Sequence, residues 1–414
     1  MAGGPDGTVP GQADVYLHIG LPKTGTSHLQ QVLWLSRERL SADGVLVPGA
    51  TRQAQRLAVW DLMGRRPRGA AQPEVAGSWQ ALVDAASGWS GSHVVVSEEF
   101  LTNARPRQAR RAVDAFAPAR VHVVLTVRDL GQVVGSVWQQ GLAKGHTWSW
   151  EEFIAAVRDP ASGPATAGGA FWLHQDLVRV LDTWETVVPR ERIHLVTVPP
   201  ASSSRHLLLE RFAAATRLDT AALVSDLAGA NVSVGVAEAE VLRRLNQGLG
   251  GRLNERQYAA AVQHGVKPAL RDRRSSARIQ VPAEELGWLT DRATAMVAEV
   301  RARGYQVAGD LRDLIPAPDA TDATDGSRPD EVDDSELADA AIAALVAVTE
   351  KYAELSGRAR RVDGAVEPSG DGGRASQARA HGYRAQMGVL RLADRNRWAR
   401  KAVATYIRRS SRTS

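Results

Sequence analysis

The chain has 414 residues, of which 44% are hydrophobic and 23% charged, and its formal net charge is +5 at pH 7. This length permits a large core and more than one domain. Because the chain has no cysteine, disulfides, thiolate catalysis and cysteine-based zinc sites are excluded. The ten histidines lack the paired spacing of a motif such as H-E-x-x-H, so we expect no metal. The mild charge gives no reason to expect a specific nucleic-acid partner.

The N-terminal segment 1–13 is rich in glycine and proline, and we expect it to be disordered. It lacks the charged and apolar regions of a secretory signal, and no apolar run in the chain reaches transmembrane length. These features predict a cytoplasmic protein. Residues 14–315 carry every candidate site motif, and we expect them to form the main domain.

The stretch 15–27, VYLHIGLPKTGTS, is the most informative part of the chain. An apolar run ends at a glycine, a short loop follows, and the pattern then becomes helical. The helix start offers unpaired amides and a positive dipole end, which together attract phosphate. Three positions of a Walker A loop are in place, namely Gly20, Gly25 and Ser27. However, Thr26 occupies the lysine position and Lys23 lies three residues earlier, which argues against an ATPase.

A second apolar run, 93–97, is followed directly by Glu98 and Glu99. Ligands of open α/β sheets gather outside the carboxyl ends of the strands, so this is a suitable place for a general base. The alternative is that both carboxylates cap the next helix. His18, two residues before the loop glycine, is a weaker candidate for contacts to acceptor or donor. A strand histidine is more often part of the core.

The third run, 121–127, ends at Arg128, and Ser136 follows eight residues later on a predicted helix. A planar guanidinium suits a phosphate, and a hydroxyl can complete its coordination. The alternative is a simple pair between Arg128 and Asp129 at the sheet edge. The same helix carries further side chains that can face an acceptor pocket: Trp138, Gln139, Gln140 and Lys144.

The string PKTGTS after HIG closely resembles the 5′-phosphosulfate loop of the sulfotransferases that use 3′-phosphoadenosine 5′-phosphosulfate (PAPS), and the resemblance covers roughly residues 14–250. It implies that Lys23 reaches the oxygen between phosphate and sulfate, inside a cradle formed by Thr24, Gly25, Thr26 and Ser27. It also implies that Arg128 and Ser136 hold the 3′-phosphate. The S-x-E spacing found in several branches selects Glu99 as the base, with Glu98 in reserve.

Two features of the cytosolic members have no counterpart here: their catalytic histidine motif and their late Arg-Lys-Gly contact to the 3′-phosphate. The third phosphate ligand and the adenine pocket therefore stay undefined. A basic group at Arg271, Arg273, Arg274 and Arg278 is not a clean substitute. The segment 231–246 resembles a late motif of bacterial members, although Asn231 or Ser233 can equally serve as a helix cap.

The implied activity is transfer of a sulfuryl group from PAPS to an acceptor hydroxyl on a glycan, a glycolipid or a small molecule, without a metal. Two alternatives stay open. One is a small-molecule kinase with a degenerate P-loop, which needs a Mg²⁺-binding carboxylate such as Asp129. The other is a non-catalytic nucleotide-binding scaffold.

The predicted fold is α/β: a P-loop-like three-layer sandwich with a central parallel sheet and a helical C-terminal extension. The expected parallel strands are 15–19, 93–97, 121–127 and 193–198, with 44–48 as an edge strand. The segment 160–169 is expected to be a loop before one helix, 171–187. Crossovers between parallel strands require helical connections of this kind.

After residue 315 the composition changes. Residues 316–336 form a predicted acidic linker, and 337–355 show an apolar helical pattern within an extension that runs over 337–414. Residues 379–414 combine ten Arg/Lys and one acid with interleaved apolar side chains. This basic amphipathic tail is suited either to an anionic membrane surface or to packing on another protein surface.

Overall fold

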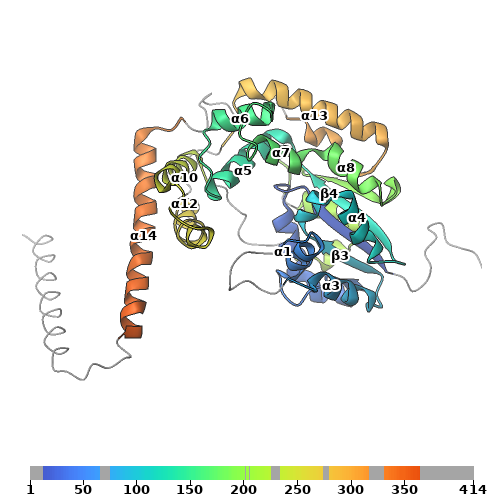
Figure 1. Cartoon of the computed structure of the whole chain (residues 1–414). Coiled ribbons are helices and arrows are strands. Elements are labelled where there is room, and N and C mark those ends of the chain that lie inside the picture. Colours follow the sequence, from blue (N-terminus) through green and yellow to red (C-terminus); the bar gives the residue numbers. More distant parts are fainter. Residues whose placement is uncertain are drawn as a thin grey trace, which may run out of the picture. The chain divides into compact units, whose positions relative to one another are not determined.

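The computed structural model describes residues 13–65, 75–200, 202–204, 206–224, 234–273, 279–316 and 331–363. The chain divides into two compact units, Met1–Val348 and Thr349–Ser414. The first unit contains the sheet, the helices around it and every described candidate site residue (Figure 1). The segment 1–12, most of the predicted linker, and the tail 379–414 lie outside the described residues.

The sheet has six parallel strands in the order β2-β3-β1-β4-β5-β6. Their bounds are Asp14–Gly20 (β1), Val45–Leu46 (β2), His93–Ser97 (β3), Arg120–Val127 (β4), Ile193–Thr197 (β5) and Gln306–Ala308 (β6). The four predicted strands and the edge strand are thus confirmed. The last strand was not predicted, because three residues at a half-exposed edge carry no periodic signal.

Alternate side chains of β1 enter two separate cores. Val15, Leu17 and Ile19 pack with helices on one face, while Tyr16 packs with helices on the other. The first face is covered by α2 (Ala54–Leu62), α3 (Ser78–Ser87), α4 (Pro106–Asp114), α8 (Leu177–Glu185) and α13 (Ala283–Arg303). The second face is covered by α1 (Thr26–Ala42) and α9 (Leu207–Thr216). All seven residues of β1 are therefore buried.

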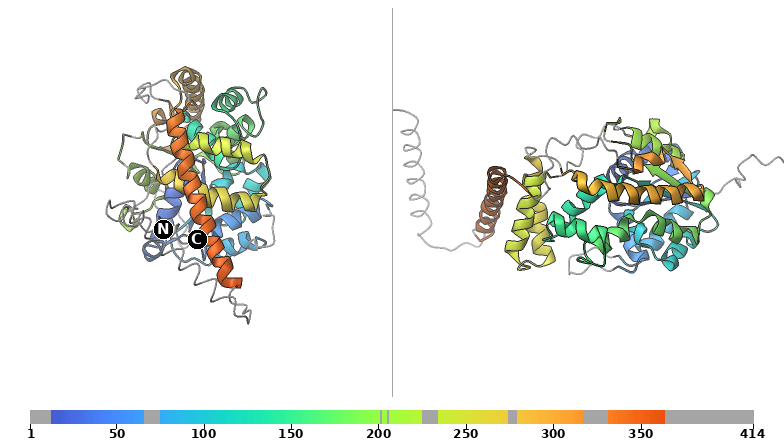
Figure 2. Two further views of the ribbon diagram at one scale, coloured as in Figure 1. Left: turned by 90° about the vertical axis from the view of Figure 1, so that its left-hand side faces the viewer. Right: turned by 90° about the horizontal axis from the view of Figure 1, so that it is seen from above.

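A third core is built from helices only. Its largest buried side chains are Trp138, Trp150, Phe153 and Phe171. They come from α5 (Leu130–Ala143), α6 (Trp150–Arg158) and α7 (Gly168–Gln175), and the core also takes in α10 (Val236–Leu249), the π-helix η4 (Ala259–Val266) and α12 (Lys267–Asp272). Figures 1 and 2 show α10 and α12 beyond α5, on its side away from the sheet. This core fixes α5 above the carboxyl ends of the strands.

Short elements complete the described structure. They are the 3₁₀ helices η1 (Glu99–Asn103), η2 (Arg190–Arg192), η3 (Thr220–Ala222) and η5 (Leu311–Leu314), the single turn α11 (Glu255–Tyr258) and the helix α14 (Asp334–Asp363). The helix predicted over 337–355 lies within α14. Among the described residues, no helix has the length and apolar character that crossing a membrane requires.

Two predictions about helix boundaries are wrong. The single helix expected over 171–187 is two helices, because Asp176 leaves the helical conformation and its side chain caps α8 by accepting from the amide of Arg179. The expected cap of the helix in 231–246 also differs. That helix, α10, starts at Val236 with Gly235 as its N-cap, whereas Asn231 and Ser233 lie outside the described residues.

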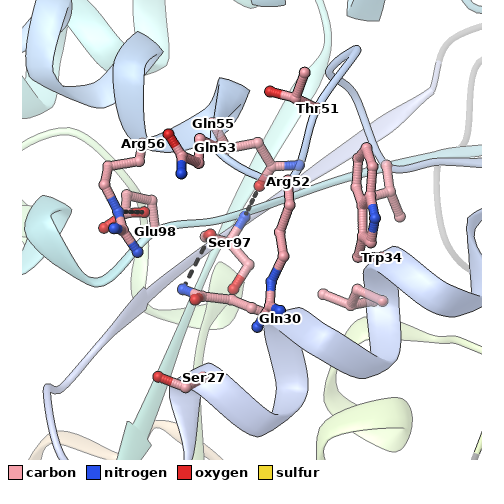
Figure 3. A pocket seen from close by; sticks show the side chains of 12 residues that line it. Ser27, Gln30, Trp34, Thr51, Arg52, Gln53, Gln55, Arg56, Ser97 and Glu98 are labelled. Carbon is pink, nitrogen blue, oxygen red and sulfur yellow. Dashed lines mark hydrogen bonds and ion pairs between the residues drawn. The ribbon is translucent and has the colours of Figure 1, made fainter. Parts of the chain in front are cut away.

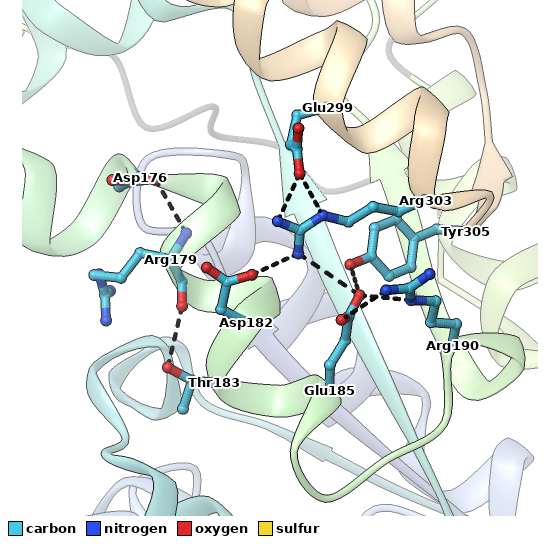
Figure 4. A network of polar contacts seen from close by, with 9 residues as sticks. All are labelled: Asp176, Arg179, Asp182, Thr183, Glu185, Arg190, Glu299, Arg303 and Tyr305. Atoms are coloured by element: carbon cyan, nitrogen blue, oxygen red, sulfur yellow. Dashed lines mark hydrogen bonds and ion pairs between the residues drawn. The ribbon is translucent and has the colours of Figure 1, made fainter.

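A polar network joins α13 to α8 (Figure 4). The Arg303 guanidinium lies 2.5 Å from Asp182 and 2.8 Å from Glu299, while the Tyr305 hydroxyl donates to Glu185. Arg190 forms an ion pair with the same Glu185 at 3.0 Å. The network anchors the chain just before β6 and so fixes the position of that edge strand.

Candidate active site

The three predicted site segments meet at one edge of the sheet. Because β1 lies between β3 and β4, the loop after β1 has a strand end on each side. Backbone hydrogen bonds fix both neighbours: the Leu21 amide donates to the Thr126 carbonyl at 2.6 Å, and the Glu98 amide donates to the His18 carbonyl at 3.0 Å. Residues a hundred positions apart in sequence are thus held around one loop.

The loop 20–26 has a backbone that few residues adopt. Gly20, Lys23 and Gly25 all have positive φ angles, of 99°, 70° and 85°. The Thr24 hydroxyl ties the loop down through the Leu21 carbonyl at 2.5 Å and the Thr126 hydroxyl at 2.6 Å. Lys23 is the informative case, because a lysine in the left-handed region is uncommon and such conformations gather at functional sites.

The start of α1 is arranged to receive an anion. Gly25 is the N-cap and supplies no side chain to the first-turn amides. A Cβ on Gly25 would lie 2.7 Å from a terminal methyl of Leu208, which could move aside, so it is the φ angle of 85° that favours glycine here. Thr26 is buried and Ser27 is exposed at the helix start. The 17-residue helix adds the positive end of its dipole, as phosphate binding needs.

Lys23 lies among other cations. Its pKa is lowered mainly by burial, and the neighbouring charges of Lys144, Lys267 and Arg128 act in the same direction, whereas Glu99 opposes them. Four cations therefore share a region with one carboxylate, which suits a ligand with several negative charges. The sequence named Lys144 among the side chains that can face an acceptor pocket, and it gave no signal for Lys267, which starts α12 after the π-helix.

Arg128 extends from the end of β4 back to the loop. One terminal nitrogen donates to the Lys23 carbonyl at 3.4 Å and the other to the Gln132 side chain at 2.5 Å. Its Nε is buried, and no described residue accepts from it. The expected alternative, a pair with Asp129, is not seen among the described contacts, because Asp129 caps α5 through the Gly131 amide at 2.8 Å.

Ser136 lies one helical turn beyond the residue that Arg128 contacts. Its hydroxyl donates to the Gln132 carbonyl at 3.0 Å, so Arg128 and Ser136 both bind Gln132. Both side chains are half-buried. The residue pair that the sequence selected for a second phosphate is therefore brought together around one glutamine, which the sequence did not indicate.

Glu98 and Glu99 point to different surroundings. Glu99 accepts from the Thr26 hydroxyl and lines a pocket with Lys23. Glu98 is only 3% exposed, lies 3.6 Å from Arg56, and caps η1 through the Phe100 amide. Burial raises the pKa of Glu98 to about 7. The capping alternative thus applies to Glu98, and Glu99 is the carboxylate beside the loop lysine.

His18 does not reach the pocket. It is fully buried, its Nδ1 lies 2.7 Å from the Ser97 hydroxyl, and its Nε2 lies 3.1 Å from the Thr126 hydroxyl. Burial lowers its pKa to about 3. The residue therefore links β1 to β3 and β4 as a neutral imidazole inside the sheet, and it is placed too deep to touch an acceptor.

A pocket of about 160 Å³ opens beside Lys23 and Glu99. Four aromatic side chains contribute to its wall: Phe100, Trp148, Phe153 and Phe171. Of the four α5 candidates only Gln140 and Lys144 line it, because Trp138 is in the core and Gln139 bonds to the Val234 carbonyl. The predicted loop 160–169 contributes Thr166 and Ala167, and His174 on α7 is a lining residue that the sequence did not single out.

The remaining predicted basic group has structural roles where it is described. Arg273 pairs with the buried Glu238 at 3.2 Å, and Arg271 pairs with Asp272 at 3.4 Å. Arg274 and Arg278 lie outside the described residues. Within the described ranges, no group of three or more His, Asp or Glu side chains is arranged to hold a metal ion.

Comparisons with protein-family models, with curated proteins and with solved structures found no match to this chain.

Proposed function

We propose that this protein is a sulfotransferase with a P-loop-like fold, which moves a sulfuryl group from PAPS to an acceptor hydroxyl. The observation that carries the proposal is the buried Arg128 Nε without a described acceptor, in a side chain that donates to the loop before α1. A donor with two separate phosphate groups matches two anion-binding features. An unsatisfied buried guanidinium nitrogen is costly unless a ligand completes it.

The residues present fit this donor. The first-turn amides of α1, those of Thr26 and Ser27 included, and the Ser27 hydroxyl would hold the 5′-phosphate. The Thr26 hydroxyl already donates to Glu99, and the Thr24 hydroxyl keeps the loop in shape. Arg128 and Ser136 would hold the 3′-phosphate. The cations Lys144 and Lys267, which act on Lys23, add attraction for the same ligand and are candidates for the undefined third phosphate contact.

When bound, the donor supplies an activated sulfuryl group and a phosphate leaving group. Glu99 takes the proton of the acceptor hydroxyl, whose oxygen forms the new bond to sulfur. Lys23 stabilises the negative charge that develops on the departing phosphate oxygen as the old bond to sulfur breaks. The products are the sulfated acceptor and adenosine 3′,5′-bisphosphate. The Thr26 hydroxyl donates to Glu99, so the proposed base is tied directly to the proposed phosphate loop.

The aromatic wall of the pocket supports an acceptor with an apolar body, such as a small molecule or the lipid end of a glycolipid. The kinase alternative is less well supported, because Asp129 is 7% exposed, lies outside the pocket and uses its carboxylate as a helix cap. The scaffold alternative would keep donor binding without turnover.

Calorimetry tests the donor. Adenosine 3′,5′-bisphosphate should bind at least about tenfold more tightly than 5′-AMP, since the extra phosphate gains charge-assisted hydrogen bonds. Arg128→Gln should remove this difference, while Arg312→Gln, a change at an 83% exposed side chain of η5, should preserve it. Equal affinities for the two nucleotides in the unmodified protein would reject the assignment, and tighter binding of ATP with magnesium would favour the kinase.

A further inference from the structure

A second and larger pocket lies on the other side of the β3 end. It has a volume of about 290 Å³, near the lower end of ordinary ligand sites. Its walls come from α1, from the turn after β2, from the start of α2 and from the end of β3 (Figure 3). Ser27 and Glu98 line this pocket, whereas Lys23 and Glu99 line the first. The two pockets therefore adjoin the same loop and strand end without sharing a lining residue.

The inner wall is held in one arrangement by amide side chains. The Gln55 carbonyl oxygen accepts from the Ser97 amide at 2.7 Å, and its nitrogen donates to the Pro48 carbonyl at 2.9 Å. Gln30 donates to the Ser97 carbonyl at 3.3 Å. A pocket whose polar groups are already fixed loses little entropy when a ligand binds.

The charges of the pocket favour an anion. Its lining has two guanidinium groups, Arg52 and Arg56, and one carboxylate, Glu98. Arg56 forms an ion pair with Glu98 at 3.6 Å. No hydrogen bond or ion pair joins Arg52 to another described residue. Burial raises the pKa of Glu98 to about 7, so its negative charge is incomplete at neutral pH. One guanidinium is thus available for a ligand's acidic group.

The other groups suit a sugar ring. Trp34 supplies an aromatic ring, one face of which carries the Arg37 guanidinium at 4.4 Å from the ring centroid, so only the other face can meet a ligand. Hydroxyl and amide side chains supply donors and acceptors at several positions, from Ser27, Gln30, Thr51 and Gln53. We propose that this pocket binds a monosaccharide unit that carries a carboxylate, with Arg52 on the acidic group, Glu98 accepting from a ring hydroxyl and Trp34 against the ring. This proposal does not require the sulfotransferase assignment, although Ser27, which is proposed for the 5′-phosphate, also lines this pocket.

Calorimetric titration of the full chain with D-glucuronate tests the site, with D-glucose and acetate as matched probes. Glucuronate should bind with a dissociation constant in the millimolar range or below, and about tenfold or more tightly than either probe. Arg52→Gln should weaken glucuronate binding about tenfold, as loss of a charge-assisted hydrogen bond does. Trp34→Ala should weaken glucuronate more than acetate. Arg312→Gln should change nothing.

Each other result overturns the proposal. Equal binding of acetate and glucuronate means an anion site without sugar recognition, and equal binding of glucose means that Arg52 has no role. Absence of saturable binding at millimolar concentration means no site. Because Arg52 is exposed, its variant should fold, which circular dichroism and a melting curve check. The titration uses no nucleotide, so a failure to bind adenosine 3′,5′-bisphosphate would leave this result standing.

Discussion

The guanidinium of Arg128 donates a hydrogen bond to the main-chain carbonyl of Lys23 at 3.4 Å. This contact links the end of β4 to the one loop lysine that has a positive φ angle. The residue proposed for the 3′-phosphate therefore also supports the backbone of the residue proposed for the reacting end of the donor. A ligand that reorients Arg128 would break this contact to the Lys23 backbone.

Lys23→Met tests the lysine. The variant keeps a long side chain but removes the positive charge, so kcat should fall by about a hundredfold or more, as for other lost transition-state contacts. The affinity for adenosine 3′,5′-bisphosphate should fall by less than about tenfold. Steady-state kinetics and calorimetry give the two numbers, with Lys351→Met on α14 as the control. A normal kcat with a raised KM would make Lys23 a binding residue only.

Glu99→Gln and Glu98→Gln separate the two adjacent carboxylates. Glu99→Gln retains a partner for the Thr26 hydroxyl but cannot take a proton, so sulfuryl transfer should fall by roughly two to four orders of magnitude. Bisphosphate binding should be unchanged. Glu98→Gln should reduce the rate far less, because that side chain lies in the other pocket. The reverse ranking in a transfer assay would move the base to Glu98.

The histidines at the opposite end of the sheet predict an acid-sensitive fold. The rings of His122 and His194 stack with their centroids 5.3 Å apart, and the pKa of each is lowered to about 4, mainly by burial. A histidine with a lowered folded-state pKa stabilises the fold fully above its unfolded value of 6.5. That contribution is lost progressively as the pH falls from 6.5 to 4, since the unfolded chain binds the proton first.

His122→Phe keeps a ring against Tyr16, which His122 contacts at 4.7 Å between centroids, and removes one titrating group. Urea midpoints at pH 7, 5.5 and 4.5 should therefore fall less steeply in this variant than in the unmodified protein. Glu98 has a raised pKa and contributes with the opposite sign in this interval, so only the difference between the two proteins is informative. The exposed His206→Gln serves as the control, and an identical slope for His122→Phe would contradict the assignment.

Arg303→Met tests the network between α13 and α8. The guanidinium is 14% exposed and contacts Asp182, Glu299 and Glu185, so its removal should reduce the free energy of unfolding by about 1–2 kcal/mol. Two of the three carboxylate partners are at least half exposed, which limits the effect. Arg301→Met, an exposed change two residues earlier, should stay within about 0.5 kcal/mol. Equal effects in denaturant melts would remove the network's role.

The central sheet was predictable because its strands are nearly continuous β-branched runs. A continuous apolar run such as 121–127 is typical of a strand that is buried on both faces of a parallel sheet. The position of the loop after the first strand was also predictable, since its glycines mark where the backbone turns. The side on which each glutamate lies followed from the strand alternation that separates Glu98 from Glu99.

What the sequence did not predict depends on packing between distant segments. Lys267 and His174 join the site through helices that the third core holds in place, and this packing leaves no local pattern in the sequence. The break at Asp176 is a local event, but an aspartate within an apolar helical pattern is also compatible with an uninterrupted helix. His18 is close to the loop in sequence, but it is fully buried inside the sheet and does not reach the pocket.

At Lys23, whose backbone is left-handed, stability of the fold and placement of a positive charge favour different residues. At φ 70° a glycine avoids a Cβ clash that costs a lysine roughly 1–2 kcal/mol. Only the lysine, however, brings an ammonium group to the place where charge would develop. A library randomised at position 23 and selected for heat tolerance should therefore enrich glycine and asparagine, and under the proposed function the enriched variants should lack sulfuryl transfer. Selection for stability alone should therefore remove lysine from position 23, whereas selection for the proposed activity should retain it.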